Sequence, residues 1–347
     1  MKKALIAILI VSLALCFVAC SKKSAETTSS SSAAASTPAK TYSGKVMLYS
    51  SMQEAQLQAV KDAFEKAYPG ITMDYYFASG GKVLTKMTTE AQGGQIAADV
   101  VWLGDPCDYE GFKANGWLEK YSSPEENHIA KAYIDPDGYY TAGRLVTMGI
   151  AWNTTLVKDS EAPKTWNELL DAKWKNQIIM TDPDQASTTK YWMTAMMQSE
   201  KYGEKFFQAL YDNGTKLESG TTATHNRVAD GSYKVGICLD YVSANLIAEG
   251  SPMNFHFTTA DVVTMTSPVA LIKGCANPDN GKLLIDFLLS KAGQEVLVEQ
   301  NLVSVRDDVA MKVDTSAIAA VNMPVDFIKL GENMKNYQAK FNKIWNK

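Results

Sequence analysis

The sequence has few of the residues that build disulfide scaffolds, zinc clusters or nucleic-acid-binding surfaces. Its 347 residues include 5 Cys and 3 His, too few for a disulfide framework or a zinc cluster in a chain of this length. Basic residues are outnumbered as well, because 34 Lys and Arg stand against 38 Asp and Glu and give a net charge of −4. Nucleic acid is therefore not an expected partner, since its phosphates bind basic surfaces.

Catalytic and nucleotide-binding signatures are also missing. The sequence contains no G-x-S-x-G, no H-E-x-x-H, no P-loop and no G-x-G-x-x-G, the patterns that mark many hydrolases, zinc proteases and nucleotide sites. We therefore expect that the protein is not an enzyme and requires no cofactor. A secreted hydrolase that uses Ser219 and His225 in one cleft stays as a distant alternative, because catalytic groups are recognised by geometry rather than by sequence order.

The N-terminal segment has the pattern of a targeting signal followed by a tether. Two lysines precede an apolar run over residues 4–18, which is the length of a signal-peptide core. Small residues then lead into Cys20, and this junction resembles the lipid-attachment site of bacterial lipoproteins. We predict that residues 1–19 are a signal peptide, that Cys20 carries lipid, and that residues 20–44 form a disordered tether. The protein would then be extracytoplasmic and held on a bacterial membrane by its lipid.

Beyond the tether, strand and helix patterns alternate in two successive sets. This order is typical of mainly parallel sheets with helices on both faces. In the first set, strand patterns cover 45–50, 71–77 and 98–103, and helical patterns cover 53–68 and 82–92. In the second set, strands are expected at 177–181, 215–217 and 235–239, with helices at 165–170, 189–201, 203–212, 222–230 and 242–249.

One extended apolar run, at 143–153, lies between these sets, and another, at 262–272, follows the second set. They predict an α/β fold of two lobes joined by two crossing segments, with the ligand site in the cleft between the lobes. The expected boundaries are 45–145 with 262–322 for lobe 1, 146–261 for lobe 2, and 323–347 for a C-terminal helix that packs on a lobe.

Four predicted strand-to-helix turns are rich in Ser, Thr and Gly. A helix N-terminus offers unpaired N–H groups and a positive dipole end, so such turns can hold an oxyanion. The alternative is that these hydroxyls only cap their helices. We expect a cleft lined by neutral donors rather than by basic side chains. The candidate ligand-binding residues in these turns are Ser50, Ser51, Ser79, Gly80, Gly81, Ser187, Thr188, Thr189, Ser219, Thr221 and Thr222.

Two carboxylates and a phenol follow predicted strands. Asp105 comes after the strand at 98–103, and Asp240 and Tyr241 come directly after the strand at 235–239. A carboxylate and a phenol in a cleft can coordinate a hard cation such as ferric iron, or the carboxylate can pair with an amine of the ligand. We therefore place all three among the candidate ligand-binding residues. The alternatives are a helix cap or turn residue for Asp105 and a hinge-side core aromatic for Tyr241.

Several stretches together carry a family resemblance. They are Met47–Ser51, Ala63–Gly70, Ala98–Trp102, Pro163–Leu170 and Asn277–Gln294. These stretches resemble the extracytoplasmic solute-binding proteins of ABC importers, and the nearest group is the ferric-iron-binding branch. The resemblance implies the two-lobed type II periplasmic-binding-protein fold and a monomer that delivers its ligand to a membrane permease and an ATPase.

The same resemblance suggests the cargo. Ferric binders of this branch hold iron with two adjacent tyrosines, often with an anion on helix N-termini. Here the matching positions are Asp240 and Tyr241, so Tyr241 matches one of the pair and Asp240 replaces the other. Ferric iron with an accompanying anion is the expected ligand, with Tyr241 and Asp240 as the metal ligands. The alternative is a small phosphonate or phosphate ester held by the Ser/Thr/Gly turns.

Overall fold

The computed structural model describes residues 42–312, 318 and 321–347. The expected signal peptide, the proposed lipid site at Cys20 and all but the last residues of the expected tether lie outside that range. No helix among the described residues combines the length and the apolar character needed to cross a bilayer.

The described strands form one sheet, in the order β2-β1-β3-β10-β5-β8-β6-β7. In its first half, β1 to β3 run parallel and β10 runs antiparallel to β3. In its second half, β6, β7 and β8 run parallel, and β9 pairs with β5 at the side. The strands are β1 (Gly44–Ser50), β2 (Ile71–Phe77), β3 (Val100–Trp102), β4 (Leu118–Glu119), β5 (Tyr140–Asn153), β6 (Ile178–Thr181), β7 (Lys216–Glu218), β8 (Val235–Leu239), β9 (Met253–His256) and β10 (Thr264–Ile272).

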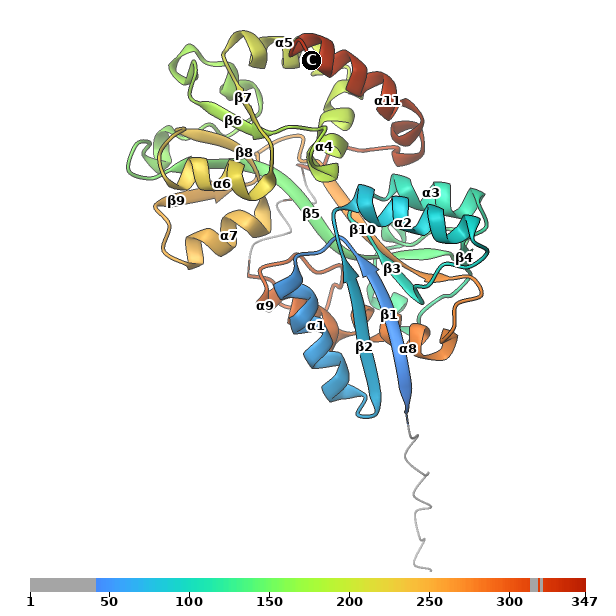
Figure 1. Ribbon diagram of the computed structural model, residues 1–347. Helices are drawn as coiled ribbons and strands as arrows, with labels where there is room; N and C mark the ends of the chain where they lie inside the picture. The colour runs from blue at the N-terminus through green and yellow to red at the C-terminus, as the bar shows by residue number, and fades with distance from the viewer. Residues whose placement is uncertain (1–41, 313–317, 319–320) are drawn as a thin grey trace, which may run out of the picture. The chain divides into compact units, whose positions relative to one another are not determined.

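Helices cover both faces of each half, as the alternating pattern predicts (Figure 1). The first half carries α1 (Glu54–Ala67), α2 (Gly80–Gln92), α3 (Cys107–Ala114), α8 (Pro278–Leu289) and α9 (Lys291–Glu299). The second half carries α4 (Ser187–Gln198), α5 (Gly203–Asp212), α6 (Thr221–Ala229) and α7 (Asp240–Ala248). Single 3₁₀ turns are η1 (Pro124–His128), η2 (Lys131–Tyr133), η3 (Asp159–Glu161), η4 (Asn167–Leu170) and η5 (Ala172–Trp174). The predicted α/β class is confirmed, whereas the helix expected at 165–170 is a 3₁₀ turn.

The C-terminal helix α11 (Phe327–Ile344) contacts helices of both halves rather than one lobe. On the second half, Phe341 is fully buried and its ring lies 5.6 Å from that of Phe207 in α5. On the first half, Cys107 at the start of α3 donates a hydrogen bond from Sγ to the Phe327 carbonyl at 3.3 Å. The helix therefore spans the junction that the sequence pattern left unassigned.

Strand β5 joins the two halves and contains a bulge beside its one charged residue. In its pairing with β10, Ser267 lies opposite Arg144 and Pro268 lies opposite Ala142, so Gly143 has no partner. Proline cannot donate a ladder hydrogen bond, and a bulge at such a point turns the neighbouring side chain to a new direction. Glycine suits the bulged position, because a Cβ there would lie 2.7 Å from Nε1 of Trp102. The bulge thus sets the direction of Arg144.

Candidate functional site

A cavity of about 590 Å³ lies where the two halves of the sheet meet. Its walls come from the strand-to-helix turns of both halves, with β5 contributing Arg144 from the segment that joins them. This volume lies within the usual range for small-molecule sites. Of the predicted ligand-binding residues, the structure places nine on its wall: Ser51, Ser79, Gly80, Gly81, Ser187, Thr188, Thr221, Thr222 and Tyr241.

Three helices begin at this cavity. They are α2 from the first half and α4 and α6 from the second, and their first residues line the wall. None of the three has a side chain that caps its N-terminus by hydrogen bonding. The first N–H groups and the positive dipole ends of these helices therefore remain available to an anion.

Three predicted hydroxyl residues do not line the cavity. Ser50 is fully buried and donates from Oγ to the Trp102 carbonyl at 2.8 Å, while its Oγ accepts from the Met52 amide at 3.1 Å. Thr189 is buried within the first turn of α4. Ser219 is exposed and its Oγ donates to Glu218 at 3.2 Å. The Ser50 hydroxyl therefore joins the ends of β1 and β3, and the other two hydroxyls lie away from the cavity wall.

Both predicted carboxylates are turned away from the cavity. One oxygen of Asp105 accepts from the Cys107 amide at 2.9 Å, within the turn that precedes α3. The two oxygens of Asp240 accept from the amides of Thr147 at 3.0 Å and Tyr241 at 2.7 Å. Burial raises the pKa of Asp105, and it raises the pKa of Asp240 to about 7. The structure therefore does not bring Asp240 together with the Tyr241 side chain as a pair of metal ligands.

Arg144 is the feature of the cavity that our sequence analysis missed. Its side chain lines the cavity, and the residue is only 4% exposed. Nε and Nη1 are buried and form no hydrogen bond within the described part of the chain, and the guanidinium carbon lies 5.3 Å from the ring centre of Tyr241. Burying an unpaired charge is costly, so this guanidinium is poised for an anion. The signal in the sequence was a lone charge within the apolar run of residues 140–153.

The other ionisable groups on the wall are Tyr241, Lys190 and Asp184. Asp184 is already satisfied, because it accepts from Asn342 at 3.1 Å and pairs with Lys347 at 3.1 Å. Lys190 forms no ion pair with any described residue. The expectation of a cleft lined only by neutral donors is therefore wrong, since two cationic side chains lie among them.

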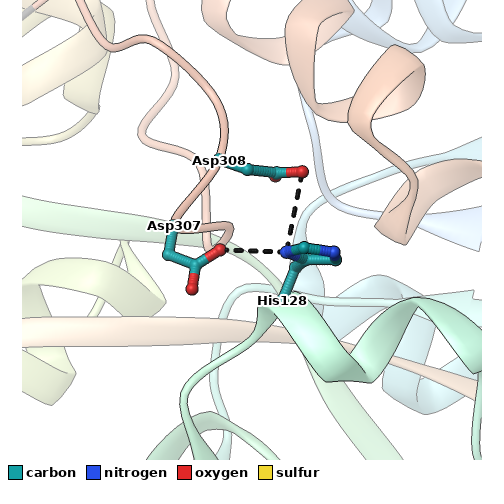
Figure 2. A group of neighbouring side chains, drawn as sticks. All are labelled: His128, Asp307 and Asp308. Carbon is teal, nitrogen blue, oxygen red and sulfur yellow. Dashed lines mark hydrogen bonds and ion pairs between the residues drawn. The ribbon is translucent and has the colours of Figure 1, made fainter.

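Within the described part of the chain, one group of His and acidic side chains has the spacing of a metal site, and it does not line the cleft. Nδ1 of His128 lies 3.2 Å from an oxygen of Asp307 and 3.6 Å from an oxygen of Asp308 (Figure 2). All three side chains are exposed or partly exposed, and Asp308 already pairs with Arg306 at 2.7 Å. This group offers no support for an iron site in the cavity.

The hydrolase alternative is not supported by the geometry of His225. Its Nε2 accepts from the Leu239 amide at 2.9 Å, which leaves the proton on Nδ1 to be donated to the Thr221 carbonyl at 2.7 Å. Burial also lowers the pKa of this imidazole. Neither nitrogen is free to accept a proton from Ser219.

Comparison with known proteins assigns the architecture. A family model described as "Bacterial extracellular solute-binding protein" matches residues 49–295. A candidate 2-aminoethylphosphonate-binding periplasmic protein of Salmonella typhimurium is 28% identical over 276 residues, which is 75% of this chain and 78% of that protein.

Two solved structures share the fold. The periplasmic binding protein AfuA of Actinobacillus pleuropneumoniae, with fructose-6-phosphate bound, superposes with a TM-score of 0.74 at 24% identity, covering 86% of this chain and 98% of that one. Iron-bound HitA of Pseudomonas aeruginosa superposes with a TM-score of 0.76 at 17% identity, covering 86% and 99%. These neighbours confirm the predicted two-lobed periplasmic-binding-protein fold.

Proposed function

The chain belongs to the bacterial extracellular solute-binding proteins, and we propose that it captures a small phosphonate or phosphate ester in the cleft and delivers it to the permease and ATPase of an ABC importer. The observation that carries this proposal is Arg144, a buried guanidinium on the cavity wall with two unpaired N–H positions. An oxyanion with several acceptor oxygens suits such a group, because guanidinium binds phosphate oxygens in a forked geometry.

The remaining wall supports the same class of ligand. Three helix N-termini without side-chain caps begin there, and each favours negative charge through its free N–H groups and dipole. Hydroxyls of Ser and Thr from both halves add donors around them. A phosphoryl or phosphonyl group would thus be held from both lobes at once, which favours the closed arrangement of the two.

Ferric iron with an accompanying anion is the second candidate, and Tyr241 favours it. This ring reaches the cavity, and tyrosinate is a strong ligand for a hard cation. Among the described residues of the wall, however, Tyr241 is the sole phenol and Asp184 the sole carboxylate, and Asp184 is held by Asn342 and Lys347. The wall therefore offers iron one free protein ligand, Tyr241, whereas it offers an anion Arg144, Lys190 and three helix N-termini.

The test is a ligand panel with thermal unfolding as the readout. Phosphonates, hexose phosphates and glycerol phosphate are compared with ferric citrate, using ligand-free protein. A bound phosphonate or phosphate ester at 100 times its Kd should stabilise the protein by about 2.7 kcal/mol. No shift with any phosphorus compound, together with a visible tyrosinate-to-iron absorption band that Tyr241→Phe removes, would reject the anion proposal in favour of iron.

We further propose that the protein acts outside the cytoplasm as a lipid-anchored monomer, without catalysis or a resident cofactor. The relatives that support an extracytoplasmic place are periplasmic binding proteins, and the anchor rests on the residues leading into Cys20. In cells fed a radiolabelled fatty acid, the unmodified protein should take up the label and the Cys20→Ser protein should not. Equal labelling of the two proteins would contradict lipidation at this residue.

A further inference from the structure

The cavity wall has more unpaired positive than negative side chains, and this excess affects which phosphorus compounds it can bind. Its ionisable side chains in the described part of the chain are Arg144, Lys190, Asp184 and Tyr241. Arg144 and Lys190 form no ion pair with any residue that the structure describes, whereas the one carboxylate is already bound by Lys347. Burial raises the pKa of Tyr241, so its phenol stays neutral. The wall therefore presents two cations and no free anion.

Lys190 occupies a position that nothing in its own helix favours. It lies in the first turn of α4, whose residues begin at Ser187, and a positive charge there is opposed by the helix dipole. Asp105 and Asp108 attract it only at a distance, and neither carboxylate lines the cavity. An anionic ligand beside the α4 N-terminus would supply the partner that Lys190 lacks.

The carboxylates that could have met a ligand amine are turned away. Asp105 accepts from the Cys107 amide, and both oxygens of Asp240 accept from backbone amides. An ammonium group in this cavity would lose its water and find no unpaired carboxylate among the described wall residues, since Asp184 is held by Lys347, and this loss is costly. A hydroxyl in its place would find Ser and Thr hydroxyls and the amides of Gln53 and Gln185 on the wall.

We propose that the cleft selects dianionic phosphate esters and phosphonates whose other polar groups are hydroxyls, and discriminates against those that carry an ammonium group. This inference rests on the proposed function. The inference distinguishes this chain from a binder of aminoalkylphosphonates. A hydroxyalkyl compound has a net charge of about −2, which matches the two unpaired cations of the wall, whereas the ammonium group of an aminoalkyl compound reduces the net charge to about −1.

The test uses two pairs of compounds that differ only by an amino or a hydroxyl group. They are 2-hydroxyethylphosphonate against 2-aminoethylphosphonate, and glucose 6-phosphate against glucosamine 6-phosphate. Calorimetric titration of the purified protein at about pH 7 keeps both amines largely protonated, including the sugar amine that lies beside oxygen-bearing carbons, and keeps most phosphoryl groups doubly charged. We expect the hydroxyl compound of at least one pair to bind about tenfold more tightly than its amino partner.

The outcomes separate this inference from the proposed function. A preference of more than threefold for the hydroxyl compound supports the inference. A smaller preference, or tighter binding of the amino compound, overturns it while leaving the proposed phosphonate or phosphate-ester function in place. Failure of all four compounds to bind at millimolar concentration overturns the inference, whereas the proposed function fails only if no phosphorus compound of the wider panel, glycerol phosphate included, raises the melting temperature.

A pair of variants assigns the selectivity to Lys190. Lys190→Gln removes one of the two free charges, so the preference for the hydroxyl compound should narrow by at least about threefold. Lys205→Gln is the matched control, because Lys205 is an exposed residue of the neighbouring helix α5 that does not line the cavity. An unchanged preference in Lys190→Gln would overturn the role given to Lys190.

Discussion

Replacing Arg144 with methionine should weaken phosphonate or phosphate-ester binding by at least about 30-fold, and should raise the melting temperature of the ligand-free protein. Loss of one partner from a buried charged pair typically costs about 2–5 kcal/mol of binding. Without ligand, however, the guanidinium is buried and unpaired at two positions. An apolar side chain of similar length removes that cost, which we expect to stabilise the free protein by about 1–4 kcal/mol. Calorimetric titration and thermal unfolding of the same samples measure both effects.

The stabilisation should depend on pH through Asp240. The pKa of this carboxyl is raised to about 7, chiefly by burial, and Arg144 is among the groups that hold it down. Above about pH 7 the ionised carboxylate of the Arg144→Met protein would lack that positive neighbour, so the gain should shrink as the pH rises. Arg227→Met is the matched control, since this arginine is about half exposed and outside the cavity wall. Unchanged affinity, or a less stable free protein at about pH 6, would contradict the role assigned to Arg144.

The alternation of strands and helices could be predicted because each element has its own periodicity and clear stops. The Pro69-Gly70 pair ends α1 where expected, and β8 matches its predicted bounds. By contrast, β4 has two residues and pairs with β10, which lies far away in the sequence. Short elements of this kind depend on tertiary pairing, which local pattern does not encode. The same holds for α3, whose eight residues follow a turn held by Asp105, a residue that we interpreted as a ligand.

The candidate site was predictable where it depends on topology. Carboxyl ends of parallel strands meet at one edge of a sheet, so the turns before α2, α4 and α6 had to converge there. The direction of a side chain at a strand end, by contrast, could not be predicted from the sequence pattern. Asp240 begins α7, and a carboxylate at that position can bind nearby backbone amides as readily as a ligand. Arg144 was missed because its direction depends on a bulge that appears only when β5 pairs with Pro268 of β10.

That bulge leads to the second large effect, which concerns stability. Trp102 is fully buried and donates from Nε1 to the Ser267 carbonyl at 3.0 Å. A Cβ on Gly143 would lie 2.7 Å from the same Nε1, closer than van der Waals contact allows. Gly143→Ala should therefore destabilise the protein by about 1–3 kcal/mol through overpacking. Trp102→Ala should cost about 3–5 kcal/mol, because it leaves a cavity in the core.

The two substitutions should be coupled, since each changes the space that the other occupies. In the Trp102→Ala protein, the new methyl group at position 143 enters the vacated volume, so the double variant should lose about 1–3 kcal/mol less than the sum of the single losses. Denaturant unfolding followed by both fluorescence and circular dichroism measures the free energy of unfolding of each variant and tests whether the two transitions coincide.

Gly111→Ala is the control, because this helical glycine has no neighbouring atom within 4 Å of a new Cβ. It should be neutral or stabilise by up to about 1 kcal/mol. Equal cost of Gly143→Ala in both backgrounds would show that Trp102 does not determine the shape of the bulge, and the direction of Arg144 would then need another cause.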